Sequence, residues 1–200
     1  INAGPGVFMH LVPAEGESID VPDKIITAFF PNSEYARVPT LVFNKLPSKV
    51  TDRILKFCEK DSRVEEVGLA TARGVYFNGN FFSNRPEHTA NIRNVMRNPK
   101  LDMALIEYSD SIVQNEGLYH WGADLVVLDQ PTDAEKILER DLLPNGVKIE
   151  VDRVNKEVLI HKNGTVQKNA FTANTLPTAI YKAIEPELKR LIEKYHTPFN

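Results

Sequence analysis

The sequence predicts an α/β fold: a three-layer sandwich in which helices cover both faces of a mostly parallel β-sheet. Three short apolar runs, over 38–43, 101–106 and 123–128, have the length and composition of buried strands. Amphipathic helical patterns separate these runs, and strands that alternate with helices are typical of parallel sheets. After residue 129 the pattern changes, and we expect short antiparallel additions and a C-terminal helix there.

Each element of the first 130 residues follows from its local pattern. Besides the first apolar run, strands are expected over 64–70, 75–77, 101–106 and 123–128. Helices are expected over 50–60 and 86–97, and a short helix or turn over 112–118. Asn84 precedes the second helix as a candidate N-cap. The dipeptides Arg73-Gly74 and Asn78-Gly79 are typical of turns.

The last 70 residues or so are expected to add elements of another kind. We predict a helix over 132–140, then an antiparallel pair of strands over 147–151 and 157–161. Asn163-Gly164 is predicted to form a tight turn beyond that pair. The final helix is expected over 176–195, with an apolar face made of Ile180, Ile184, Leu188, Leu191 and Ile192.

The composition excludes several classes of partner. The chain has 200 residues, of which 42% are hydrophobic and 26% charged, and its formal net charge is -3. It has no basic excess for binding nucleic acid, and no apolar run approaches the roughly 18–20 residues that span a bilayer. We therefore expect neither nucleic acid nor a membrane as partner, and the cytoplasm as compartment. Cys58, the single cysteine, is interpreted as a buried apolar residue rather than a nucleophile.

The start of the sequence suggests two parts. It begins at Ile1 without an initiator methionine, so we expect a piece of a longer chain. Residues 1–36 are irregular and rich in proline, glycine and acidic side chains, with one short helical pattern over 22–30. We expect residues 1–36 to be the end of an upstream domain plus a linker, and residues 37–200 to be the α/β domain.

The turn after the first strand is the first candidate site. A phosphate-binding loop combines glycines, a lysine at the start of the helix and a hydroxyl group for Mg²⁺. Lys49 stands at the start of the expected helix and Thr51 supplies a hydroxyl, so both are candidate nucleotide-binding residues. Lys45 and Ser48 occupy the glycine positions, however, and Val50 follows the lysine where a hydroxyl is needed. An ordinary strand-to-helix turn with a solvated lysine explains the same pattern.

Glu107 is the second candidate, because it ends a buried strand. Ligands of parallel sheets lie beyond the carboxyl ends of the strands, so Glu107 is a candidate magnesium ligand or acid/base group. A carboxylate in solvent or in an ion pair is the alternative. The five histidines are scattered without the spacing of zinc ligands, and no residue is singled out as catalytic.

The first residues of the chain are similar in sequence to a known family. Ile1-Asn2-Ala3-Gly4-Pro5-Gly6, followed by Met9-His10-Leu11 and Pro13, resembles the junction in cyanophycin synthetases where an ATP-grasp domain ends and a Mur-ligase-like domain begins. Weaker, collinear matches continue to about residue 130 and include Gly68-Leu69-Ala70-Thr71, Gly74-Val75-Tyr76 and Asn98-Pro99. The resemblance implies a fold like the central domain of Mur ligases, which is P-loop-NTPase-like.

The resemblance also implies a function for the parent enzyme. Such an enzyme uses ATP and Mg²⁺ to form amide bonds through acyl phosphates, adding amino acids to an aspartate-based peptide, and its ATP-grasp domain lies upstream. Asn2 matches an ATP-grasp asparagine that helps to hold Mg²⁺, Lys49 matches the phosphate-loop lysine, and Glu107 matches a magnesium-binding glutamate.

Departures from the family pattern keep three functions open. The loop glycines, the threonine after the lysine, an arginine-glycine-glycine stretch (here Asp110-Ser111-Ile112) and a histidine-bearing segment are all missing. The chain is then a non-catalytic module, without a cofactor of its own, that packs against the ATP-grasp domain or forms a homo-oligomer. Alternatively, it keeps a Mg-ATP half-site built on Lys49 and Glu107. The third reading is a binding module for an acidic ligand or peptide.

Overall fold

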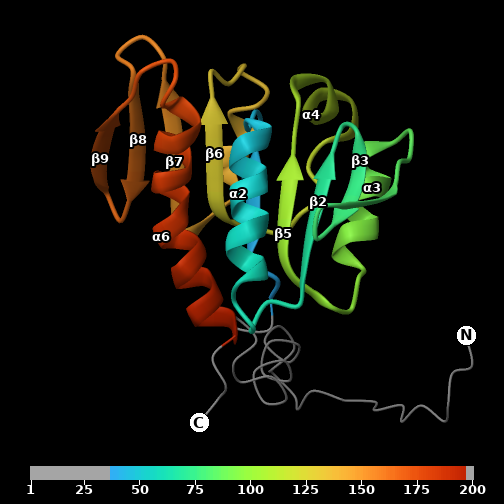
Figure 1. Ribbon diagram of the computed structural model, residues 1–200. Helices are drawn as coiled ribbons and strands as arrows, with labels where there is room; N and C mark the ends of the chain where they lie inside the picture. Colours follow the sequence, from blue (N-terminus) through green and yellow to red (C-terminus); the bar gives the residue numbers. More distant parts are fainter. Residues whose placement is uncertain (1–36, 197–200) are drawn as a thin grey trace, which may run out of the picture. The chain divides into compact units, whose positions relative to one another are not determined.

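Nine strands form one mixed sheet in the computed structural model, which describes residues 37–196 (Figure 1). The strands are, in chain order, β1 (Thr40–Phe43), β2 (Glu66–Thr71), β3 (Gly74–Phe77), β4 (Asn80–Ser83), β5 (Leu101–Glu107), β6 (Ala123–Asp129), β7 (Leu142–Asp152), β8 (Glu157–Lys162) and β9 (Thr165–Ala170). They lie side by side in the order β4-β3-β2-β5-β1-β6-β7-β8-β9.

The centre of the sheet is parallel and both edges are antiparallel. Strands β2, β5, β1, β6 and β7 pair in parallel, while β3 and β4 extend one side and β8 and β9 the other by antiparallel pairing. The expectation of a mostly parallel sheet holds for the centre, and the whole sheet is mixed. Tight turns close the outer hairpins: the φ angles are 49° and 81° at Asn78-Gly79, and 48° and 74° at Asn163-Gly164.

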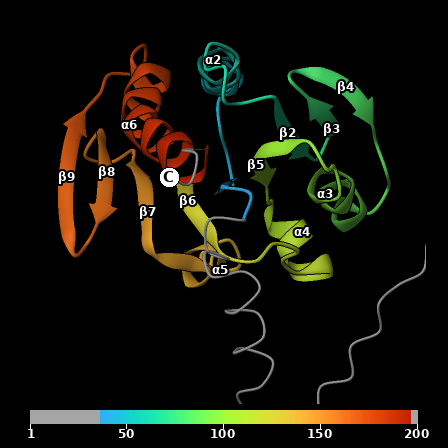
Figure 2. The same ribbon diagram turned by 90° about the horizontal axis from the view of Figure 1, so that it is seen from below.

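Helices lie on both faces of the sheet, which confirms the expected three layers. The helices are α2 (Ser48–Glu59), α3 (His88–Met96), α4 (Asp110–Glu116), α5 (Ile137–Arg140) and α6 (Leu176–His196). Figure 2 shows α2 and α6 on one face, and α3, α4 and α5 on the other. The predicted C-terminal helix is α6, and all five residues of its predicted apolar face are buried.

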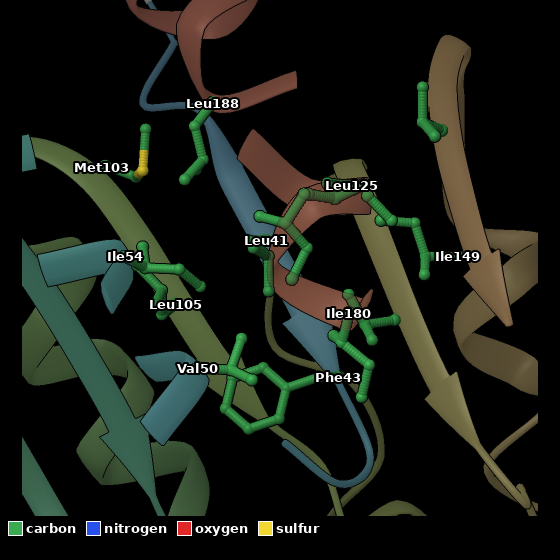
Figure 3. Packing of buried hydrophobic residues seen from close by; sticks show 14 of the residues in the cluster. Leu41, Phe43, Val50, Ile54, Met103, Leu105, Leu125, Ile149, Ile180 and Leu188 are labelled. Atoms are coloured by element: carbon green, nitrogen blue, oxygen red, sulfur yellow. The ribbon is translucent and has the colours of Figure 1, made fainter. Parts of the chain in front are cut away.

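Each face of the sheet buries its own apolar cluster. Under α2 and α6, side chains from β1, β5 and β6 gather around Ile54 and Ile180 (Figure 3). The second cluster lies on the face of α3, α4 and α5. Cys58 is fully buried in the first cluster, and burial, followed by the charge of Asp61, raises the pKa of its thiol to about 12. The thiol therefore stays protonated, which agrees with the interpretation of Cys58 as an apolar residue.

Two local predictions are wrong because tertiary contacts decide the structure. Only Ile137–Arg140 is helical in the segment 132–140, and its N–H groups bond to carbonyls three residues back, as in a tighter turn. Asn84 does not cap α3. The carboxylate of Glu116, from the end of α4, accepts hydrogen bonds from the N–H groups of His88 (3.1 Å) and Thr89 (2.7 Å) instead.

Strands β4 and β9 were not expected, because neither carries the alternation of apolar and polar residues that a half-buried strand shows. The helical pattern over 22–30 and the candidate magnesium ligand Asn2 lie outside the described residues. Among the residues that the structure describes, no helix is long and apolar enough to cross a membrane.

Candidate functional site

The turn between β1 and α2 lies at the topological switch point of the sheet. β1 is the central parallel strand, and it leads through α2 to β2 on one side. Its neighbour β6 leads through α5 to β7 on the other side. In open α/β sheets ligands bind beyond the carboxyl ends of the strands at such a point. The carboxyl ends of the parallel strands form the upper edge of the sheet in Figure 1. The structure places Lys49 and Glu107 at this edge, since Phe43 at the end of β1 pairs with Glu107 at the end of β5.

The candidate nucleotide-binding residues are on the first turns of α2. Lys49 is the second residue of the helix and is exposed, whereas Thr51 is half-buried. The residue before the helix is Pro47, with φ −57° and ψ 136° and no side-chain cap. The helix therefore starts at the predicted place, with its lysine directed at no partner that the structure describes.

The backbone of this turn does not form an anion cradle. A phosphate nest requires successive N–H groups in a turn that includes left-handed residues, and none of residues 44–49 has a positive φ. Pro47 has no N–H to offer. The N–H of Lys45 already donates to Asn44 Oδ1 at 2.8 Å. A turn of this kind, without glycine and without left-handed residues, is an ordinary strand-to-helix connection.

Asn44 fills the space between the ends of β1 and β6. Its side chain is 3% exposed, and its Nδ2 donates to the carbonyl of Asp129 (3.0 Å) and to Glu135 Oε2 (2.8 Å). Its Oδ1 accepts from the N–H groups of Lys45 and Asp129, each at 2.8 Å. One amide side chain therefore satisfies four partners and joins β1 to β6 and to the turn before α5.

The carboxylates of Glu135 and Asp129 extend this network. Glu135 is also buried, and its carboxylate accepts from the N–H of Thr132 (2.9 Å), whose hydroxyl accepts from the N–H of Glu135 (3.2 Å). Asp129 is 2% exposed and receives both Nε (2.7 Å) and Nη2 (2.5 Å) of Arg153. The hydrogen bond with Asp129 raises the pKa of Arg153, because the carboxylate stabilises the guanidinium. We call Asn44, Asp129, Glu135 and Arg153 the Asn44 network.

Glu107 lies one strand away and is more open. Its carboxylate accepts one hydrogen bond, from the N–H of Ala72 at 3.0 Å. Its carbonyl receives Nε2 of the buried His88 at 2.7 Å. Burial lowers the pKa of His88, so its ring is neutral with the proton on Nε2. Within residues 37–196 no group of three acidic, histidine or cysteine residues is arranged to hold a metal ion, so Glu107 has no companion protein ligands there.

A cavity of about 260 Å³, which we call the Glu107 cavity, opens between the loop after β2 and the starts of α3 and α4, and its lining includes Ala72 and His88, which both form a hydrogen bond with Glu107. Polar side chains line it, among them Arg85, Ser109, Ser111, Asn115 and Glu116, whose carboxylate accepts hydrogen bonds from the N–H groups at the start of α3. The buried Asn91 fixes the backbone of Arg85, because its Oδ1 accepts from the N–H of Arg85 (2.8 Å) and its Nδ2 donates to the carbonyl (3.1 Å). This edge therefore has a closed half, at the Asn44 network, and an open half, at the Glu107 cavity.

Sequence reasoning missed the Asn44 network, although part of its signal was available. Asn44 follows a buried strand directly and Asp129 ends one, the same position that singled out Glu107. The partners Glu135 and Arg153 carry no such signal, because nothing local indicates that turns 91 and 24 residues away in sequence reach these side chains.

The chain was also compared with known proteins. No family model matches it. The curated cyanophycin synthetase of Geminocystis herdmanii is 25% identical over 153 residues, and that of Trichormus variabilis is 23% identical over 168 residues. Each match covers 74% of this chain. The chain is related to the cyanophycin synthetases. These matches confirm the predicted relationship to the family. The chain spans only 17% and 18% of the length of these two cyanophycin synthetases.

Proposed function

We propose that this chain is a Mur-ligase-like domain of a cyanophycin-synthetase-like, ATP-dependent amide ligase, with a structural or oligomerising role and no catalytic one. Its kinship with cyanophycin synthetases supports the ligase context. A central strand followed by a switch-point turn and helix supports the comparison with a P-loop-like Mur domain. The observation that carries the non-catalytic role is the Asn44 network.

Nucleotide phosphates would have to displace this network. A hydrogen bond to a charged group contributes about 1.5–3 kcal/mol, and leaving a buried partner unpaired costs a similar amount. Asn44 would lose its bonds to Glu135 and to both backbone groups of Asp129. The buried carboxylates of Glu135 and Asp129 would also repel a phosphate chain in a site of low dielectric. A turn without glycines offers too few donors to offset these losses.

In this proposal ATP and Mg²⁺ serve the parent enzyme. Residues 1–36 would complete the upstream ATP-grasp domain, with Asn2 as a magnesium ligand, and residues 37–200 would pack against that domain or join copies of the enzyme. The parent chain would form amide bonds, and this domain would need no cofactor of its own.

Calorimetric titration with Mg-ATP, together with a thermal shift assay, tests the proposal. We expect neither heat nor a change in Tm at several millimolar nucleotide, whereas saturation at 100 times the Kd would add about 2.7 kcal/mol of apparent stability. Lys49→Ala is the matched control, because this exposed side chain has no role in packing. Binding by the wild type that disappears in Lys49→Ala would overturn the proposal in favour of a Mg-ATP half-site with Lys49, Thr51 and Glu107.

The Glu107 cavity favours a second candidate, a module that binds an acidic peptide. Arg85, whose backbone is held by Asn91, offers its guanidinium to a carboxylate. The hydroxyls of Ser109 and Ser111 can also donate to a carboxylate. Titration with an aspartate-rich peptide tests this function, with Arg85→Ala as the variant and Arg140→Ala, an exposed arginine elsewhere, as control. Binding that is lost only in Arg85→Ala would support the peptide-binding function, and an absence of binding in the wild type would eliminate it.

A further inference from the structure

The two edge strands of the sheet differ in how they are protected against further pairing. β9, at one edge, carries Lys168, which forms an ion pair with Glu157 (3.1 Å), and a lysine on an edge strand discourages pairing with other strands. β4, at the other edge, has the sequence Asn-Phe-Phe-Ser and no charged residue. Phe81 is 62% and Phe82 63% exposed. β4 thus leaves a row of backbone groups and two aromatic side chains open at the end of the sheet.

The two phenylalanines point to opposite faces of the sheet. Phe81 pairs with Tyr76, which packs on the α2 and α6 side, and the two rings meet edge to face at 5.6 Å. Phe82 meets Phe77, on the α3 side, in the same manner at 5.3 Å. These contacts cover only the inner flank of each ring. The outer flanks would be covered by side chains of one further strand.

A cavity of about 580 Å³ continues this edge, reaching from Phe81 to the side of α3. Its rim is formed by Phe77, Phe81 and Phe82, and the rest of its lining is polar, with amide side chains such as those of Asn80 and Asn94 and the charged side chains of Glu66 and Arg97. The formal charges of Glu66 and Arg97 cancel, and the aromatic rim suits a partly aromatic occupant without a net charge.

We propose that β4 pairs with β4 of a second copy of this chain, so that two nine-stranded sheets join into one continuous sheet. The proposal deepens the oligomerising role in the proposed function. Two identical strands pair antiparallel about a twofold axis perpendicular to the sheet, and such an interface is isologous. Residues directly opposite each other point to the same face, so the residue on the axis must face its own copy.

The regular part of the β3–β4 pairing favours an axis at Phe81. Phe77–Asn80 and Tyr76–Phe81 are regular pairs, and the register shifts beyond them. An axis at Phe81 puts the two Phe81 rings opposite each other on the α2 side. It puts Phe82 of each copy opposite Asn80 of the other, at the mouth of the 580 Å³ cavity. Aromatic side chains that are exposed in the single chain thereby fill both faces of the interface between the two β4 strands.

Self-pairing fits β4 better than a charged partner. Identical charged strands would repel each other, but residues 80–83 contain no ionisable side chain. For the same reason the strand offers no charge to attract an acidic or basic peptide. Four residues form a small joint compared with the roughly 1,600 Å² of a standard interface, so we expect a weak, concentration-dependent dimer.

Sedimentation equilibrium of the 200-residue chain, from about 1 µM to about 1 mM, covers the range of a weak dimer. Phe81→Lys places like charges opposite each other and should weaken the association about tenfold or more. Val166→Lys, at an exposed position of the other edge strand, is the matched control and should leave the association unchanged. A wild-type chain that is monomeric throughout, or association lost in Val166→Lys and kept in Phe81→Lys, would overturn the proposal.

Cysteine cross-linking tests the register. Phe81→Cys should form a disulfide-linked dimer on mild oxidation, because the two positions face each other, whereas the equally exposed Phe82→Cys should do so poorly. A mixture of Asn80→Cys and Phe82→Cys chains should cross-link efficiently. The buried Cys58 thiol, with its raised pKa, adds no background. Cross-linking of Phe82→Cys alone, but not of Phe81→Cys, would contradict the register. The Mg-ATP titration is independent of all these results, so nucleotide binding and self-pairing can fail separately.

Discussion

The two halves of the sheet's carboxyl edge show how differently one kind of position can be used. After β1, the buried Asn44 amide bonds to the Glu135 carboxylate and to the backbone of Asp129, and the Asp129 carboxylate holds Arg153, so that the switch point is closed. After β5, the Glu107 carboxylate accepts one backbone N–H, from Ala72, and Ala72 lines an open, polar cavity. Both positions are strand ends at the same edge. The difference is whether partners from distant turns reach the strand end, and this decides whether it is part of the core or free for a ligand.

The largest effect is expected from Asn44→Ala, on the closed half. It removes four hydrogen bonds and leaves the Glu135 carboxylate and the backbone of Asp129 without their partner in a buried place. We expect a loss of about 3–4 kcal/mol in the free energy of unfolding, measured by urea denaturation. Asn115→Ala, at the rim of the open cavity, is the matched control and should change stability by less than about 0.5 kcal/mol. Equal losses in the two variants would erase the distinction between the halves.

A smaller loss is expected from Arg153→Ala, at the rim of the closed half. The variant leaves the buried Asp129 carboxylate without its bidentate partner. Breaking a buried ion pair costs about 3–5 kcal/mol, but the Arg153 side chain is 43% exposed and solvent screens it, so we expect about 1–2 kcal/mol. Lys136→Ala, which removes a fully solvated pair with Asp133, should have almost no effect on thermal unfolding. A stability of Arg153→Ala equal to that of the wild type would show that Asp129 is satisfied without the arginine.

The sequence predicted the layers of this fold better than the contacts at its candidate site. The buried runs and the apolar faces of the helices predicted the central strands, α2 and α6, because burial imposes a period that is visible locally. The same patterns predicted that Lys49 and Glu107 lie at the carboxyl edge of the sheet, where the structure has them. They did not predict the Asn44 network or the capping of α3 by Glu116, since these depend on contacts between segments far apart in the chain. The exposed strands β4 and β9 were missed because pairing with a neighbour, without burial, leaves no pattern.

The smallest effect sharpens the comparison from the open half, through the pH dependence of stability. Burial lowers the pKa of His88 in the folded state, although the charges of Glu116 and Glu107 offset part of this shift. In the unfolded chain a histidine titrates near a pKa of about 6.5. Below that pH the unfolded state binds more protons, so the stability from neutral His88 falls as the pH drops from about 6.5 towards the lower, folded pKa.

We therefore expect the free energy of unfolding to decrease by up to about 1 kcal/mol between roughly pH 6.5 and 5, measured by urea denaturation at each pH. His88→Asn should flatten this decrease, whatever its stability at neutral pH, because the group that titrates is gone. His161→Asn should remove less of the slope, since His161 is more exposed, and burial followed by the charge of Lys148 lowers its pKa. A slope that is unchanged in His88→Asn would mean that the buried ring takes up its proton as readily in the folded state as in the unfolded one. The open half of the edge would then be as accessible to water at His88 as it is at Glu107.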